Sequence, residues 1–193
     1  AYMTVTAITR KKKPVIASII SQVTPSESSV IKRVAYEPLF LNHLRQTLGI
    51  QGVQSVTMHE PLTNIRKVIT LKVAADMPRT EIWRALYGAA TFQAACGKYV
   101  IAVNEDIDPD NPDAIFWAMS YRARPHKDIE ILKHQNEGHG PRSTTDSEDS
   151  AVLIDATLKE TFPPISLPKR EFMERAAVIW DELGLPKLKP EAP

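Results

Sequence analysis

Hydrophobic and polar positions alternate with two different periods along the 193 residues, and the two periods predict strands and helices that follow one another. β-branched runs with a period of two predict strands, whereas a continuous apolar run predicts a strand that is buried on both faces of a parallel or mixed sheet. Strands are expected at residues 2–9, 15–20, 53–58, 67–74 and 151–154, and a strand buried on both faces is expected at 99–103. The first two strands are expected to pair as a hairpin around a basic turn at residues 10–14.

Apolar residues at helical spacing predict four helices, and the clearest start is the sequence TPSE at residues 24–27. Thr24 is the expected N-cap of a capping box with Glu27, and Pro25 is the first helical residue. This helix is expected to kink or restart at Pro38 and to end near Gly49. The other helices are expected from residue 78, from residue 112 with an Asn cap before it, and at 167–183.

Because helices and strands alternate, the sequence predicts an α/β fold with a layered mixed sheet flanked by helices. We expect one domain at residues 1–183 and an extended Pro-rich tail at 184–193. Residues 134–150 are polar and rich in Gly, Ser and Thr, so we expect a flexible loop or lid there. The chain opens with Ala-Tyr-Met and enters a strand-like run at once, which suggests a piece of a longer protein.

Composition narrows the class of protein. Apolar residues make up 43% and charged residues 24%, a balance typical of soluble globular proteins. With 24 basic against 23 acidic residues, the charge gives no reason to expect a nucleic-acid partner. No apolar run approaches ~18 residues, so we expect no membrane span. The single cysteine, Cys96, excludes an intrachain disulfide and suits the cytoplasm. A buried, inert thiol is favoured for Cys96 over a nucleophile.

The acidic segment at residues 105–113 is the most conspicuous chemical feature. It fails as a calcium loop, because Asn111 stands where the turn needs Gly and Trp117 where the bidentate Glu belongs. Two readings stay open: carboxylates that cap helix N-termini, or a role at the carboxyl edge of a sheet, where α/β ligand sites lie. Arg122 and Arg124 follow, and they are expected either to clamp a carboxylate or phosphate or, more simply, to pair with the acids at 108–113.

Other familiar sites are not supported. The five histidines show no metal-ligand spacing, so no metal site is expected in this chain, although His134 and His139 are placed where a loop could bring them to a substrate. No Gly-rich phosphate loop and no serine-hydrolase elbow are present. The residues by themselves therefore predict a soluble α/β domain without a self-contained catalytic group.

Six blocks in order nevertheless match a family pattern. They are YMTVTAIT at 2–9, TPSE at 24–27, EDID at 105–108, AIFWAMSYRARP at 114–125, IDAT at 154–157 and IWDEL at 179–183. Together they resemble the C-terminal half of the UbiD family of reversible (hetero)aromatic and acrylic acid decarboxylases, and the resemblance covers nearly the whole chain.

The resemblance implies that catalysis belongs to another domain. Family members hold prenylated FMN, with a divalent metal and potassium, in an N-terminal domain that also carries the catalytic Glu-Arg-Glu set. We therefore expect no catalytic residue in this chain, no cofactor held by it alone, and no activity without that domain. Its partners would be the N-terminal flavin domain, a second copy in a homodimer or larger oligomer, and a small aromatic or unsaturated acid.

For this half, the resemblance implies a layer that closes over the flavin and builds the subunit interface. Ile31 is the expected aliphatic wall of the substrate pocket, Cys96 is expected to approach the cofactor, and His139 belongs to the expected lid. Phe92 stands near a position where some relatives have a flavin-phosphate lysine, so a phosphate contact is not expected here. The alternative function is a non-catalytic interaction module or an accessory subunit of a multi-subunit carboxylase.

Overall fold

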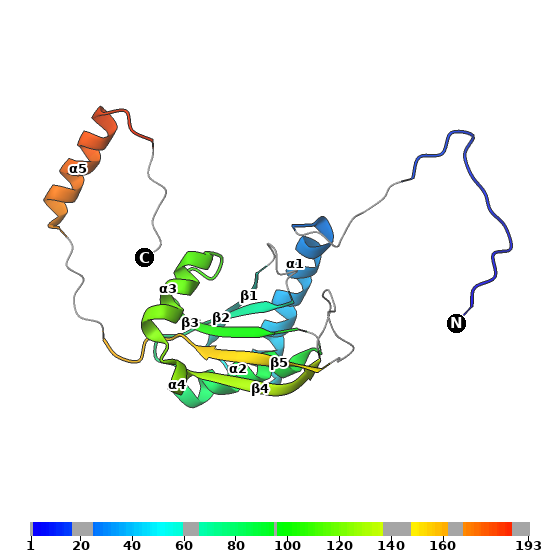
Figure 1. Cartoon of the computed structure of the whole chain (residues 1–193), viewed down its shortest axis with the longest axis horizontal. Helices are drawn as coiled ribbons and strands as arrows, with labels where there is room; N and C mark the ends of the chain where they lie inside the picture. Colours follow the sequence, from blue (N-terminus) through cyan, green and yellow to red (C-terminus); the bar gives the residue numbers. More distant parts are fainter. Residues whose placement is uncertain are drawn as a thin grey trace.

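A mixed sheet of five strands, in the order β1-β2-β3-β5-β4, forms the centre of the molecule, with helices on both faces (Figure 1). This computed structural model describes residues 2–16, 25–59, 66–94, 96–136, 148–161 and 168–186. The strands are β1 Val53–Met58, β2 Val68–Val73, β3 Tyr99–Asn104, β4 Ile129–Asn136 and β5 Glu148–Asp155. The helices are α1 Glu27–Asn42, the π-helical turn η1 His43–Thr47, α2 Arg79–Phe92, α3 Pro112–Arg122, α4 Pro125–Asp128 and α5 Arg170–Glu182. The predicted α/β class with a mixed sheet is confirmed.

The three central strands are parallel, and an antiparallel strand lies at each edge. β2 pairs with β3 and β3 with β5 in parallel, while β1 and β4 run antiparallel to β2 and β5. The chain leaves β2 for α2 on one face of the sheet and leaves β3 for α3 on the other face. The carboxyl ends of β2 and β3 therefore form a topological switch point, the place where open α/β sheets bind ligands.

The larger core lies between the sheet and α1, η1 and α2. Phe40 is fully buried there and meets Phe92 edge to face, with ring centroids 4.9 Å apart. Gly88 allows α2 to approach η1, because an added Cβ would lie 2.5 Å from Leu48 Cδ1 and 3.1 Å from Leu44 Cδ2. The helical segment formed by α1 and η1 was predicted to end near Gly49. This end is confirmed, because Gly49 has a φ of 73°, a left-handed conformation that favours glycine. Helix α1 continues through Pro38 without restarting.

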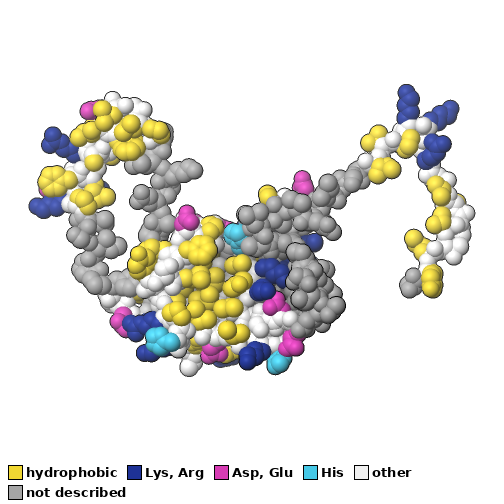
Figure 2. Space-filling model, in the orientation of Figure 1, with side chains coloured by type: hydrophobic (Ala, Val, Ile, Leu, Met, Phe, Trp, Pro, Cys, Tyr) yellow, Lys and Arg dark blue, Asp and Glu magenta, His cyan; other side chains and the backbone are white. Residues whose placement is uncertain are grey.

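The second face of the sheet is only partly covered. α3 packs over the carboxyl half of the central strands, whereas the strand register places one row nearer their amino ends: Val68, Tyr99, Val152 and Ile131. In this apolar row, Tyr99 is 41% and Ile131 64% exposed. Figure 2 shows hydrophobic side chains gathered over the sheet on the face in view. Such an exposed apolar surface on the described part of the domain is suited to contact with another domain or subunit.

Two helices also present apolar side chains outward. The α1 stripe is Ile31, Val34, Ala35 and Pro38, which share one side of the helix and are all exposed. The α5 stripe, at the same spacing, is Phe172, Met173, Ala176, Ile179, Trp180 and Leu183. α5 buries none of its residues, although Trp180 Nε1 of the stripe donates to Pro186 O at 2.8 Å.

Several predicted elements need correction. Residues 2–9 form no strand, and neither do residues 15 and 16, because residues 2–16 are exposed and pair with no described strand. The other half of the expected hairpin, residues 17–20, lies outside the described residues. The N-cap of α1 is Ser26, whose Oγ accepts from Ser29 N at 3.3 Å, whereas Thr24 lies outside the description.

The expected loop at 134–150 is shorter than predicted. Residues 134–136 end β4 and residues 148–150 begin β5, while 137–147 lie outside the described residues. β4 was not predicted. It is an edge strand with many exposed polar residues, so hydrophobic and polar positions do not alternate clearly along it. The tail was expected to be extended, but residues 187–193 also lie outside the description. The domain boundary at 183 stays a prediction.

Candidate functional site

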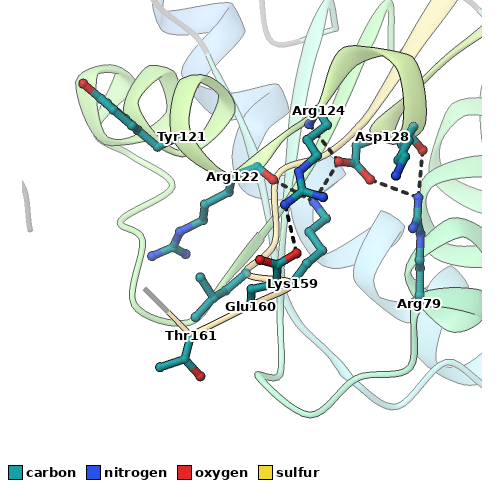
Figure 3. Close-up of a pocket in the computed structure, with 10 residues that line it drawn as sticks. Arg79, Tyr121, Arg122, Arg124, Asp128, Lys159, Glu160 and Thr161 are labelled. Carbon is teal, nitrogen blue, oxygen red and sulfur yellow. Dashed lines mark hydrogen bonds and ion pairs between the residues drawn. The ribbon is translucent and has the colours of Figure 1, made fainter. Parts of the chain in front are cut away.

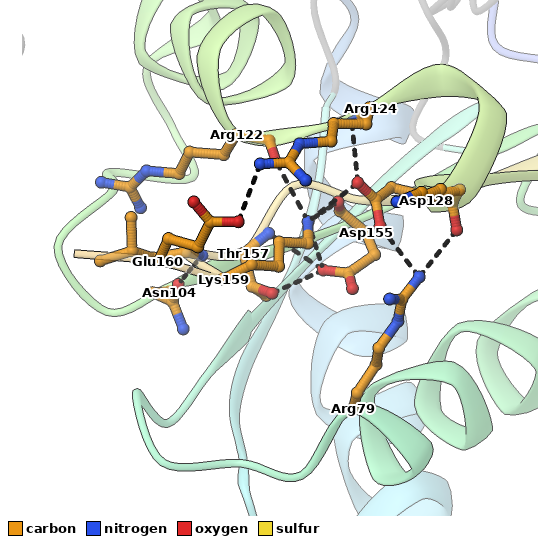
Figure 4. Close-up of polar contacts among 11 residues, drawn as sticks. Arg79, Asn104, Arg122, Arg124, Asp128, Asp155, Thr157, Lys159 and Glu160 are labelled. Atoms are coloured by element: carbon orange, nitrogen blue, oxygen red, sulfur yellow. Dashed lines mark hydrogen bonds and ion pairs between the residues drawn. The ribbon is translucent and has the colours of Figure 1, made fainter. Parts of the chain in front are cut away.

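Two buried carboxylates lie at the carboxyl edge of the parallel strands, where a switch-point site is expected. Asp155 ends β5, and Asp128 immediately precedes β4, whose first residue pairs near the end of β5. Asp128 Oδ1 accepts from Arg79 Nη2 at 2.9 Å, and Oδ2 accepts from the backbone N of Arg124 at 2.7 Å (Figure 4). Helix α4 is thereby tied to the first residue of α2.

Lys159 connects the two carboxylates. Its Nζ lies 3.2 Å from Asp155 Oδ1 and 3.8 Å from Asp128 Oδ2. Asp155 Oδ1 also accepts from Thr157 N at 3.1 Å and from Thr157 Oγ1 at 2.6 Å, while Oδ2 has no hydrogen-bond partner within the described residues. Asn104 at the end of β3 accepts from Leu158 N at 2.6 Å. The IDAT block therefore builds a fixed turn that joins the ends of β3 and β5.

The acidic segment has structural partners. Asn111 caps α3 through its Oδ1, which accepts from Asp113 N at 3.0 Å, as expected for a capping role. Asp106 receives two hydrogen bonds from Arg122, whose side chain is buried over the Trp117 ring at 5.1 Å. These hydrogen bonds from Arg122 hold the pKa of Asp106 below its ordinary value, against the opposing effect of burial.

The predicted pairing of the two arginines with the acids at 108–113 is wrong. Arg122 pairs with Asp106, and Arg124 reaches Glu160 with Nη2 to Oε1 at 2.9 Å. Asp110 instead pairs with Arg33 of α1. The spacing did not distinguish Asp106 from the later acids, because only the turn after β3 decides which carboxylate faces the end of α3.

A cavity of about 300 Å³ opens beside this network (Figure 3). Its walls come from the first turn of α2, the end of α3, α4 and the segment after β5. The lining residues are Arg79, Tyr121, Arg122, Arg124, Lys127, Asp128, Leu158, Lys159, Glu160 and Thr161. Arg79, Lys127 and Lys159 were missed by sequence reasoning, since no motif joins residues from four separate segments.

Of the three residues expected to line the flavin and substrate, Ile31 and Cys96 are described, and their surroundings differ. Ile31 is 70% exposed in the α1 stripe, whereas Cys96 belongs to the larger core. Burial raises the pKa of the Cys96 thiol, while Arg66 and Lys67 act to lower it. The thiol is therefore suited to packing rather than to attack as a thiolate. His139 lies outside the described residues.

The described residues contain no group of three or more His, Cys, Asp or Glu positioned to hold a metal ion. Phe92, at the position where the resemblance places a lysine in some relatives, stacks on His43 with ring centroids 4.0 Å apart. The described helices also lack the length and apolar content needed to cross a lipid bilayer.

Comparison with known families identifies the domain. Residues 30–156 match the family of the 3-octaprenyl-4-hydroxybenzoate carboxy-lyase C-terminal domain, the C-terminal domain of UbiD enzymes. The chain belongs to the UbiD family. This match covers more than half of the chain, including the whole sheet, and confirms the resemblance found in the sequence blocks.

Solved UbiD-class structures share the fold. The UbiD-class enzyme HmfF from Pelotomaculum thermopropionicum, in complex with FMN, superposes with a TM-score of 0.64 at 23% identity, over 78% of this chain and 34% of that one. Vanillic acid decarboxylase from Sedimentibacter hydroxybenzoicus, in closed form, gives 0.61 at 17% identity, over 80% and 34%. The 3,4-dihydroxybenzoic acid decarboxylase from Enterobacter cloacae gives 0.60 at 18% identity, over 77% and 33%. The chain thus spans about a third of the length of these relatives.

Proposed function

We propose that this chain is the C-terminal part of a UbiD-family carboxy-lyase that reversibly decarboxylates an aromatic, heteroaromatic or α,β-unsaturated acid. The observation that carries the proposal is the family match over residues 30–156. Structural similarity to a vanillic acid decarboxylase and a 3,4-dihydroxybenzoic acid decarboxylase supports the same reaction class. The described residues fit a supporting part. Their buried charged side chains form ion pairs, and these ion pairs stabilise the carboxyl edge of the sheet.

In this proposal, prenylated FMN, a divalent metal and potassium are held mainly by a second domain. Similarity to HmfF in complex with FMN supports a flavin enzyme. When bound, the prenylated flavin would supply the electron sink for carbon dioxide loss. Residues of this chain would exclude water and orient the substrate, and the proton would be moved by groups outside it. By itself the chain would be inactive.

The α1 stripe is the surface we assign to the flavin and substrate. Four apolar side chains exposed on one side of a helix are costly in water, at roughly 25 cal/mol for each Å² of apolar surface. Contact with a partner domain would remove that cost, and it would place Ile31 against the substrate. The apolar row at Tyr99 and Ile131 extends the area available for such contact. Because Cys96 is buried, it would affect the active site only indirectly, through its packing in the core.

The α5 stripe is the surface we assign to self-association. One side of α5 is apolar and no residue of the helix is buried. The same apolar stripe on a second copy of the chain could pack against it in a symmetric interface. An evolved dimeric form of HmfF is among the similar structures, which supports self-association in a homodimer or larger assembly. The proposed role of this part is therefore to cover the active site and to join subunits.

The pocket assignment is tested in an enzyme that joins this chain to its flavin-holding domain, loaded with prenylated FMN. Ile31→Ala is expected to change relative kcat/KM across a panel of aromatic and unsaturated acids. Val178→Ala is the matched control, because Val178 is 56% exposed on α5 but lies outside the α5 stripe. An unchanged substrate range for Ile31→Ala would remove Ile31 from the pocket. If no flavin domain supports decarboxylation with this chain, the alternative of a non-catalytic module is favoured.

A further inference from the structure

The cavity at the carboxyl edge of the sheet has an excess of positive charge that its own carboxylates do not neutralise. Five cationic and two anionic side chains line it. Two of the cations belong to the network: the buried Arg122 pairs with Asp106, and Lys159 is held between Asp155 and Asp128. The other three cations, Arg79, Arg124 and Lys127, are exposed to the cavity and to solvent.

These three cations keep donors available. Arg79 uses Nη2 for Lys127 O and Asp128 Oδ1, at 2.7 and 2.9 Å, which leaves its Nε and Nη1 without an acceptor in the described part of the chain. Among the described residues, the Arg124 side chain donates through Nη2 alone, to Glu160. The ammonium of Lys127 has no acceptor among the described residues. A guanidinium with a free edge is the group that binds carboxylate or phosphate oxygens in parallel hydrogen bonds.

Glu160 occupies the position of a replaceable anion. Its side chain is 71% exposed, and its partner Arg124 is 56% exposed. Exposed pairs of this kind contribute only about 0–1 kcal/mol, so a ligand oxyanion can displace Glu160 at little cost. Asp128, by contrast, is buried at the back of the cavity and fixes Arg79 by the hydrogen bond already described. Figure 3 shows Arg124 reaching the exposed Glu160 and Arg79 reaching the buried Asp128.

We propose that this cavity binds a small molecule bearing phosphate or carboxylate groups, held by Arg79, Arg124 and Lys127. A volume of about 300 Å³ is at the lower end of small-molecule pockets, which suits a compact anion. The cavity follows β2, β3 and β5 at their carboxyl ends, beside the switch point. Cys96 precedes β3 at its amino end, so the cavity and Cys96 lie at opposite ends of that strand.

Isothermal titration calorimetry on the 193-residue chain tests the proposal, with inorganic phosphate in one series and citrate in the other, at constant ionic strength. Saturable binding of either anion is expected, and the series that binds identifies the ligand chemistry. Arg124→Gln and Lys127→Gln should each weaken binding, by roughly tenfold for Arg124, whose hydrogen bonds to the anion are charge-assisted. Lys133→Gln, an exposed lysine on β4 outside the cavity, is the control and should bind as the parent does.

Glu160→Gln separates a ligand site from a merely structural network. If Glu160 competes with the ligand, its removal should tighten binding by roughly two- to fivefold. A structural role alone predicts no gain. Absence of saturable binding of both anions at millimolar concentration would overturn the proposal, as would equal affinity of the parent, Arg124→Gln and Glu160→Gln proteins. These outcomes are independent of decarboxylase activity.

Discussion

Replacing Asp128 with Asn tests whether the carboxyl-edge network holds the fold together. The substitution preserves shape but removes the charge of a carboxylate that is 2% exposed. Asp128 accepts from Arg79 Nη2 at 2.9 Å and from Arg124 N at 2.7 Å, and it lies 3.8 Å from Lys159 Nζ. Both ends of α4 and the start of α2 therefore depend on one side chain.

The expected loss follows from these contacts. Hydrogen bonds to a charged group contribute about 1.5–3 kcal/mol each, and breaking a buried ion pair costs about 3–5 kcal/mol. The Arg79 side chain is 52% exposed and can be rehydrated, and the Asn carbonyl can still accept one N–H, so the loss should be smaller. We expect Asp128→Asn to lower the free energy of unfolding by about 2–3 kcal/mol.

Urea unfolding of the 193-residue chain at pH 7, followed by circular dichroism, measures this loss as a lower midpoint with an unchanged slope. Glu160→Gln is the matched control, because it removes a carboxylate of the same cluster from an exposed pair, and its effect should stay within about 0.5 kcal/mol. A loss for Asp128→Asn no larger than that of the control would refute the reasoning that burial makes Asp128 important.

Two further predictions concern the end of α3 and the last helix. Asp106→Asn should lower stability at pH 7 by about 0.5–1 kcal/mol, a value discounted because the Asp106 side chain is 54% exposed. Since Arg122 lowers the pKa of Asp106, the stabilisation is present above the ordinary pKa and is lost as pH falls through the lowered value. The difference between the proteins should therefore shrink below about pH 4, and a constant difference would contradict the assignment. Phe172→Asp, on the α5 stripe, should shift the enzyme toward smaller species in sedimentation velocity, whereas Val178→Asp should not; equal behaviour would reject the α5 contact.

Local signals predicted much of the fold. β1 was expected at residues 53–58 and lies at Val53–Met58, because a short run that contains β-branched residues predicts a strand by itself. Asn111 was recognised as a cap, since its role depends only on the next three residues. The run at residues 2–9 misled because β-branched composition shows a tendency to pair but does not supply a partner strand.

Less of the candidate site than of the fold could be predicted from the sequence. The cavity could not be foreseen from the sequence. Arg79 and Lys159 are 80 residues apart, and both reach Asp128 because the parallel strands β2 and β5 end at the same edge of the sheet. Ile31 was placed correctly on a helix, but helical spacing alone did not show that its side faces outward.

The central claim is that the reaction centre is built outside these residues. Its most direct test is to compare release of carbon dioxide from a panel of aromatic and unsaturated acids by the 193-residue chain and by an enzyme joining it to a flavin-holding domain, both supplied with prenylated FMN. We predict release by the joined enzyme and none by the chain alone, which should also lose the flavin absorbance on gel filtration. Carbon dioxide released by the 193 residues unaided, with flavin retained at one per chain, would contradict the account.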